Sequence, residues 1–300
     1  MLTAKRITVL LSMVTALVFM ALPAMAEELS VKENRTRSGI VNITVPYISG
    51  SVGGKNIDDM VNRAVLSYVN SQMKQVLSQQ ETKTFESTHP EPRELSDMLH
   101  YNTDLVKYTD KTIVDKNTEG RVTASWFVQN EYEVKAAKDT FYSVILKTKT
   151  YTGGSTNVVV WKAMNFDLKD GHLMELKELF DAEADYAGRL QTLIGYQQKG
   201  RARLIRHIKG KKVPEPVPVS ITGQENFYVD DHYNLGIILY SGTSETTPAS
   251  VDGDVAKTEE APDKTVADGS NQSAVNRQSG TAKIEVYDIS LNDFADLIKL

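Results

Sequence analysis

Hydrophobic positions recur along the chain with two different periods, and the period separates predicted strands from predicted helices. Alternation of apolar and polar positions predicts strands at residues 39–48, 121–134, 142–146, 158–166, 227–229, 235–240 and 284–289. The second, third and fourth of these are joined by short turns, which predicts an antiparallel meander. The segments 227–229 and 235–240 flank a polar turn and predict a hairpin.

Apolar residues at helical spacing predict two long amphipathic helices, over 57–77 and 181–209. Asn56 is the expected N-cap of the first helix, because its side chain can accept a hydrogen bond from an unpaired backbone amide. Gly195 and Gly200 are candidate breaks in the second helix, since glycine is a poor helix former.

Prolines and polar runs mark the segments between these elements. Pro46 suggests that the first strand lies at the edge of a sheet or ends there. Proline occupies every second position of 214–218, so 213–219 should be an extended connector. Residues 81–120 are polar and poorly periodic and receive no assignment. A short amphipathic helix is expected over 291–300.

One long segment lacks the residues that a folded core needs. Residues 241–280 are rich in Thr, Ser, Ala, Asp, Glu and Gly, and no aromatic residue occurs between Tyr240 and Tyr287. Such a segment cannot bury enough apolar area to offset the entropy of ordering it, so we expect a disordered insertion. Because a strand pattern resumes at 284–289, the insertion should interrupt a folded domain.

Together these elements predict an α+β fold, in which antiparallel sheets each pack against amphipathic helices. Two subdomains are expected, an N-terminal one at 38–150 and a C-terminal one at 151–300 that contains the insertion.

The N-terminus has the layout of a cleavable secretory signal peptide at 1–26. A short basic stretch precedes an uncharged apolar run of 16 residues at 7–22, and Ala24 and Ala26 supply the small residues of a cleavage site. An uncleaved membrane anchor is the alternative, but the run is shorter than the ~20 residues that span a bilayer. We therefore expect an exported mature chain that starts at Glu27, is periplasmic or extracellular, and has no membrane span.

Composition narrows the possible chemistry. The chain has no cysteine, which excludes disulfides, thiolate metal sites, a cysteine nucleophile and a lipid-modified N-terminal cysteine. The net charge is −5, and removal of Lys5 and Arg6 leaves 32 basic against 39 acidic residues, or −7. Because phosphate binding needs a basic surface, we expect no nucleic-acid partner.

Asp230, Asp231 and His232 form the most chemically suggestive cluster. Two carboxylates and an imidazole could bind a metal or move a proton. Consecutive residues at a strand end point in different directions, however, and a polar hairpin turn explains the cluster equally well. The sequence contains no H-x-x-x-H or G-x-S-x-G spacing. We assign no catalytic residue, no metal ligand and no cofactor.

The strongest charge feature is a basic run at 199–212. Its seven cations in 14 residues are Lys199, Arg201, Arg203, Arg206, Lys209, Lys211 and Lys212. The run could form a surface for anionic wall polymers or lipid head groups. The alternative is a solvated helix face whose C-terminal cations suit the helix dipole. Trp126 and Trp161 could stack on sugar rings if they were exposed, although the alternation places both in the core.

Three passages carry a family resemblance. They are Tyr-Thr-Gly-Gly at 151–154, Asn-Phe-Asp-Leu-Lys-Asp-Gly at 165–171 with Leu-Lys-Glu-Leu-Phe at 176–180, and Phe-Tyr-Val-Asp-Asp at 227–231. In this order they resemble the paired extracytoplasmic domains of the PdaC/RsiV-like family, over about residues 38–300. Members of that family form the outer part of a lysozyme-sensing anti-sigma factor. Others precede the catalytic domain of certain peptidoglycan deacetylases.

The resemblance implies binding to a wall component or to a wall-acting enzyme such as lysozyme. The chain departs from the family at 155–157, where Ser-Thr-Asn replaces the usual Ala-His, and at the insertion. We expect neither a deacetylase domain nor a sigma-binding segment. The expected function is therefore that of a noncatalytic exported binding protein, whose partner is a cell-wall polymer or an envelope protein. The alternatives are a wall-modifying enzyme that uses 230–232 and an envelope-stress sensor module.

Overall fold

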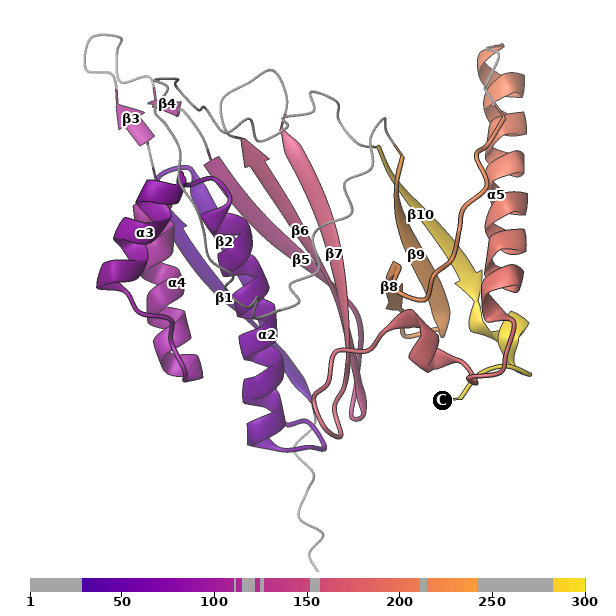
Figure 1. Ribbon diagram of the computed structural model, residues 1–300, viewed down its shortest axis with the longest axis horizontal. Helices are drawn as coiled ribbons and strands as arrows, with labels where there is room; N and C mark the ends of the chain where they lie inside the picture. The colour runs from indigo at the N-terminus through magenta and orange to yellow at the C-terminus, as the bar shows by residue number, and fades with distance from the viewer. Residues whose placement is uncertain are drawn as a thin grey trace, which may run out of the picture.

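The computed structural model describes residues 29–110, 112–114, 122–124, 127–151, 157–210, 215–241 and 283–299. Within these residues the chain forms a five-stranded sheet, a three-stranded sheet, a two-stranded sheet and four α-helices (Figure 1). The α+β class expected from the sequence is confirmed. The expected signal peptide at 1–26, and the expected insertion beyond Ser241, lie outside the described residues.

The first sheet has the strand order β1-β2-β5-β6-β7. Its strands are β1 (Ser30–Ser38), β2 (Val41–Ser49), β5 (Phe127–Lys138), β6 (Phe141–Tyr151) and β7 (Val158–Asp167). The meander predicted for β5, β6 and β7 is confirmed. The contact between β2 and β5 is parallel, at Asn42 and Ile43, so the sheet is mixed. The sequence pattern missed β1, because four of its nine residues are charged and hide the alternation.

Asn130 holds β2 and β5 together where their backbones part. Its buried side chain donates from Nδ2 to the Thr44 carbonyl at 2.8 Å and accepts from the Thr148 hydroxyl at 2.8 Å. The amide thus links the two strands without leaving a buried polar atom unpaired. β2 lies inside the sheet, and not at its edge as Pro46 suggested. Past Ile43, however, its backbone pairs with β1 and no longer with β5, so a proline is tolerated there.

Three helices cover one face of this sheet (Figure 1). They are α2 (Lys55–Lys74), α3 (Gln79–Thr88) and α4 (Leu95–Thr109). α2 begins directly after Gly54, so Asn56 lies in the first turn and is not the N-cap. α3 and α4 occupy most of the segment 81–120 that received no assignment. The start of α3 carries a signal that the sequence contained, a capping box between Ser78 and Glu81.

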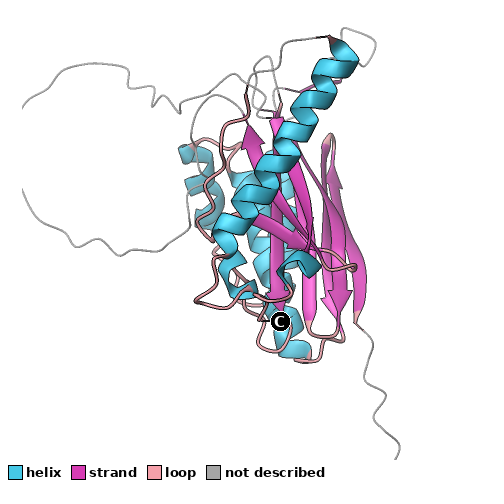
Figure 2. Ribbon diagram, turned by 90° about the vertical axis from the view of Figure 1, so that its right-hand side faces the viewer, coloured by secondary structure: helices cyan, strands magenta, loops and turns pink. Residues whose placement is uncertain are grey.

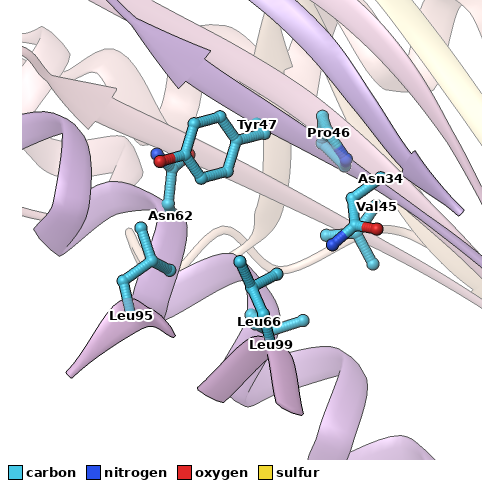
Figure 3. Close-up of a pocket in the computed structure, with 8 residues that line it drawn as sticks. All are labelled: Asn34, Val45, Pro46, Tyr47, Asn62, Leu66, Leu95 and Leu99. Carbon is cyan, nitrogen blue, oxygen red and sulfur yellow. The ribbon is translucent and has the colours of Figure 1, made fainter. Parts of the chain in front are cut away.

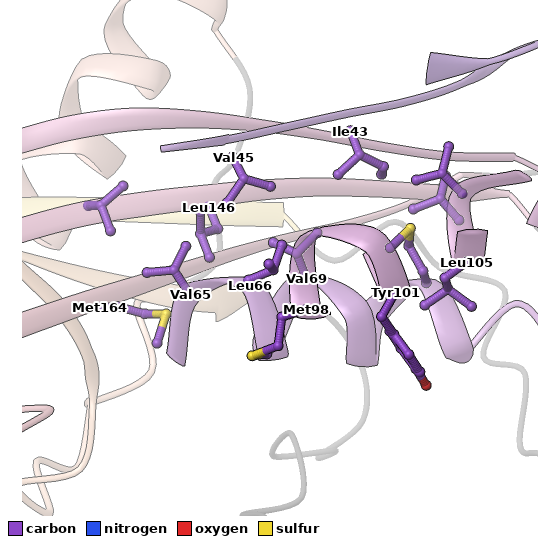
Figure 4. Close-up of a cluster of buried hydrophobic side chains, with 14 of the residues drawn as sticks. Ile43, Val45, Val65, Leu66, Val69, Met98, Tyr101, Leu105, Leu146 and Met164 are labelled. Carbon is purple, nitrogen blue, oxygen red and sulfur yellow. The ribbon is translucent and has the colours of Figure 1, made fainter. Parts of the chain in front are cut away.

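The first hydrophobic core lies between these helices and the sheet. Figure 4 shows Val65 and Val69 of α2 facing Val45 of β2 and Leu146 of β6, and all four side chains are buried. The apolar spacing of α2 predicted this buried face, because residues four apart lie on one side of a helix. β3 (Thr112–Val114) and β4 (Val122–Ala124) pair with each other in a short two-stranded sheet.

The second sheet has the order β10-β9-β8. Its strands are β8 (Asn226–Val229), β9 (Asn234–Ser241) and β10 (Lys283–Ser290). The predicted hairpin of β8 and β9 is confirmed. In the pairing of β9 with β10, Ser241 lies opposite Lys283, so the two strands that flank the expected insertion are neighbours in one sheet.

Two 3₁₀ helices, η1 (Leu176–Leu179) and η2 (Leu291–Phe294), close the core under the second sheet. The helix expected over 291–300 is therefore a single 3₁₀ turn. Leu291 and Phe294 are buried in this turn, and beyond it Ile298 forms a β-bridge with Phe180. The contact with Phe180 holds the chain extended where a longer helix would have turned away.

α5 (Tyr186–Lys209) packs on the same face of the second sheet as η1 and η2, where Leu190 and Ile194 are buried in this second core (Figure 2). It begins after Asp185, whose carboxylate accepts a hydrogen bond from the Gly188 amide at 3.0 Å, and not at 181. Gly195 and Gly200 do not divide it. A glycine costs a helix only about 1 kcal/mol, and the packing of the N-terminal half on the sheet offsets this. The helix ends at Gly210, which has the left-handed backbone that commonly closes a helix.

The two sheets pack against each other, so the described residues form four layers: helices, sheet, sheet and helix (Figures 1 and 2). Ile145 and Ala163 of the first sheet contact Tyr228 and Ile238 of the second. The expected subdomain boundary at 150/151 would assign β7 to the C-terminal part, whereas β7 is the outer strand of the first sheet.

Side chains of the second sheet bond to the free edge of β7. Asn226 accepts from the Ala163 amide at 2.8 Å and donates to the Trp161 carbonyl at 2.5 Å. The Tyr240 hydroxyl lies 2.7 Å from the Trp161 amide nitrogen and 2.6 Å from its carbonyl oxygen. These contacts satisfy an edge that would otherwise be open to pairing with another chain.

Candidate functional site

The part of the basic run at 199–209 forms the C-terminal half of α5, called here its distal half. Lys199, Arg203 and Arg206 lie at positions i, i+4 and i+7, which share one helix face, and Lys209 follows in the last turn. All four side chains are exposed. None of the 24 residues of α5 is acidic, so no carboxylate within the helix neutralises these cations.

Two cations of the run, Arg201 and Arg206, contact neighbouring segments. Arg201 donates to the Val286 carbonyl of β10 at 2.6 Å, and its guanidinium lies 4.4 Å from the centre of the Tyr287 ring. It therefore anchors α5 to the sheet. Arg206 also forms an ion pair with Glu215, at 3.7 Å. Lys211 and Lys212 lie outside the described residues.

The apolar residues in the distal half of the same helix are exposed. Leu204, Ile205 and Ile208 belong to the apolar set whose spacing predicted the helix. They are 58%, 37% and 69% exposed. The helical period predicts which face is apolar, but it does not tell how far along the helix the sheet beneath it extends.

Asp230, Asp231 and His232 lie in the turn between β8 and β9, and the turn accounts for the first of them. Asp230 Oδ1 accepts from the backbone amides of His232 at 2.9 Å and Asn234 at 2.8 Å, and Oδ2 accepts from the Asn234 side chain at 2.9 Å. Burial acts to raise the pKa of Asp230, but these hydrogen bonds outweigh it and hold the pKa below its ordinary value. Asp231 and His232 are exposed. The geometry favours the polar-turn interpretation.

A different cluster, which the sequence analysis missed, brings together potential metal ligands. Asp167, Asp170 and His172 place one ligand atom each within 4.8 Å of one another, in the turn after β7. Asp170 and His172 are exposed, and Asp170 Oδ1 lies 2.6 Å from His172 Nδ1. This hydrogen bond raises the pKa of His172. Because backbone amides already bond to both carboxylates, the cluster is explained as a closed turn, and we assign no metal to it.

Two concave regions stand out in the described residues. The first, shown in Figure 3, lies between β2, α2 and α4 and has a volume of about 10 Å³, which holds no more than one water molecule. The second, of about 590 Å³, is an open hollow beside the turn that leads into α2. Its buried carboxylate, Asp58, already accepts from the amides of Gly50 at 2.9 Å and Ser51 at 3.2 Å. Asp58 thus fixes the turn.

Of the two tryptophans considered for sugar stacking, the structure describes only Trp161. Trp161 packs against the contact between the two sheets, and the ammonium group of Lys147 lies 4.5 Å from the centre of its ring. Trp161 is therefore half-buried, whereas the alternation placed it in the core. Trp126 lies outside the described residues. Among the helices that the structure describes, none is long and apolar enough to cross a membrane.

Comparison with known proteins gives similarity in structure alone. No protein-family model matches the sequence, and no curated protein matches it. A solved structure of a DUF3298 family member from Bacteroides fragilis is 14% identical, with a TM-score of 0.43 over 71% of this chain and 84% of that chain. A DUF3298 family protein from Pseudomonas aeruginosa is 12% identical, with a TM-score of 0.39 over 71% of this chain and 83% of that one. The function has to be argued from this chain's own residues.

Proposed function

We propose that this chain is an exported, noncatalytic binding protein of the bacterial cell envelope, and that the distal half of α5 binds an anionic envelope component. The observation that carries the proposal is the separation of charge. α5 holds six Lys and Arg residues and no Asp or Glu, so the other 276 residues hold 28 basic and 39 acidic residues. A compact positive surface on an otherwise acidic protein is specific for anions, because the rest of the surface repels them.

Export is the second part of the proposal. It is supported by the signal-peptide pattern at 1–26 and by the resemblance of 165–171 to PdaC/RsiV-like extracytoplasmic domains. Expression of the full chain, followed by fractionation and N-terminal sequencing, tests it. A mature protein that begins at Glu27 and leaves the cytoplasm is the expected result. An uncleaved chain in the cytoplasm would overturn this part.

Sedimentation with isolated cell-wall material tests the binding. The expected result is cosedimentation that weakens as salt is added, because exposed charges are screened over about 8 Å at physiological ionic strength. The variant Lys199→Gln/Arg203→Gln/Lys209→Gln should lose most of the binding. A control with three exposed lysines changed elsewhere should keep it; these are Lys55, Lys83 and Lys169.

Four outcomes would count against the proposal. Equal loss in both variants would mean that only net charge matters, and unchanged binding in the α5 variant would place the binding surface elsewhere. Release of soluble fragments from the wall material by the purified protein would overturn its noncatalytic character. Binding to a lysozyme-type enzyme that survives the α5 substitutions would point to a protein partner on another surface.

A further inference from the structure

The apolar stripe of α5 continues beyond the sheet that the helix covers. In the N-terminal half, Leu190 and Ile194 are buried in the second core. At Arg201 the helix still contacts β10. Beyond it, Leu204 and Ile208 continue the same face but are exposed. Figure 1 shows the C-terminal end of α5 extending past the end of β10.

The cations of this half lie on the opposite side from the stripe. Lys199, Arg203 and Arg206 are about half a turn away from Leu204 and Ile208, since each residue advances a helix by 100°. The distal half of α5 is therefore amphipathic, with an aliphatic face on one side and a cationic face on the other.

The aliphatic face distinguishes between anionic ligands. A hydrated polyanion can satisfy the cations, but it gains nothing from Leu204, Ile205 and Ile208. An anionic bilayer surface matches both faces, because aliphatic side chains enter the boundary between head groups and acyl chains while long cationic side chains reach the phosphates. A second copy of the chain packed on the aliphatic face would leave the cations of both copies on the outer side without an anion, so it matches only one of the two faces.

We infer that the distal half of α5 docks on an anionic lipid bilayer, with Leu204, Ile205 and Ile208 toward the acyl chains and the four cations at the phosphates. This inference rests on the proposed function and names its ligand. Residues 199–209 span three turns, which is enough for peripheral contact and too short to cross the membrane.

Cosedimentation of the purified protein with vesicles tests the inference. We compare phosphatidylcholine alone, phosphatidylcholine mixed with phosphatidylglycerol, and soluble polyphosphate as a competitor. Each cation near an anionic bilayer raises partitioning roughly fivefold, so Lys199→Gln/Arg203→Gln/Lys209→Gln should weaken binding on the order of 100-fold. Leu204→Ser/Ile208→Ser should weaken it on the order of 100-fold or more, because both side chains would stay in water. The apolar control, Val52→Ser/Val158→Ser, changes two equally exposed residues elsewhere and should have no effect.

The outcomes separate the inference from the proposed function. Binding to anionic vesicles that depends on both faces supports both. The inference is overturned if the protein binds wall material and polyphosphate but does not bind vesicles. It is also overturned if Leu204→Ser/Ile208→Ser has no effect on binding. Either result leaves the proposed function standing. Binding to none of them overturns both. Circular dichroism of each variant shows that α5 is retained, so that a loss of binding is not a loss of folding.

Discussion

Asn165 should be among the most stability-sensitive positions where the two sheets meet. Its buried side chain donates from Nδ2 to the Phe227 carbonyl of β8 at 2.7 Å, and its Oδ1 accepts from the Ser143 hydroxyl at 2.7 Å. One amide thus links β6, β7 and β8. The substitution Asn165→Ala removes both hydrogen bonds and leaves the carbonyl and the hydroxyl buried without a partner.

The expected loss in the free energy of unfolding follows from these two buried groups that no longer have a hydrogen-bond partner. A buried polar group that loses its partner costs about 1–3 kcal/mol, so the loss of two partners in Asn165→Ala should lower the free energy of unfolding by about 2–6 kcal/mol. Ser143→Ala leaves only the Asn165 Oδ1 without a hydrogen-bond partner and should cost about 1–3 kcal/mol. Because the two side chains share a hydrogen bond, the double variant should lose at least ~0.5 kcal/mol less than the sum.

Urea unfolding, followed by tryptophan fluorescence and by circular dichroism, measures these free energies. Trp161 lies at the junction and reports on its opening, and coincident curves from the two probes justify a two-state analysis. The control is Asn292→Ala, at an exposed asparagine, which should change stability by less than ~0.5 kcal/mol. The reasoning is refuted if Asn165→Ala costs less than ~1 kcal/mol, or if the effects of Asn165→Ala and Ser143→Ala simply add.

Three further predictions follow from single contacts. Gly236→Ala should destabilise the second sheet by about 1–3 kcal/mol, because the new Cβ would lie 2.1 Å from the Tyr228 ring; an unchanged melting temperature would contradict this. Asp58→Ala should cost about 2–4 kcal/mol in urea unfolding, because the part-buried amide of Gly50 and the buried amide of Ser51 lose their acceptor, whereas Asp58→Asn should cost less. In an NMR titration, the pKa of His172 should lie above 6.5 and fall toward that value in Asp170→Asn. Since this pKa is raised in the folded state, its stabilising contribution is fully present below pH 6.5 and is lost as pH rises through the folded-state pKa; a pKa at or below 6.5 would rule the contact out.

Part of the candidate site on α5 could be predicted from the sequence. The basic run predicted Lys199, Arg203, Arg206 and Lys209 as exposed cations, because four-residue spacing is a local property of one helix. It did not separate Arg201 from them. That residue turns toward β10, which is 82 residues further along the chain, and no local pattern carries this information.

The exposure of the apolar stripe at the end of α5 could not be predicted from the sequence either. Leu204 and Ile208 have the spacing of core residues, and whether they are buried depends on the length of the sheet beneath α5. The Asp167, Asp170 and His172 cluster left a weak signal in its own spacing, but turns of this composition are common without a ligand.

The sequence by itself determined the α+β class, the meander, the hairpin and the two long helices, because each follows from a period of two or 3.6 residues within one segment. Tertiary structure alone decided the parallel contact of β2 with β5, the place of β7 in the first sheet, and the face-to-face packing of the two sheets. These depend on pairings between distant segments, and the polar side chains that carry them, such as Asn130, Asn165 and Asn226, have no periodic pattern. For the same reason, only the tertiary structure shows that α5 extends beyond its sheet and that the C-terminal end of its apolar stripe is exposed.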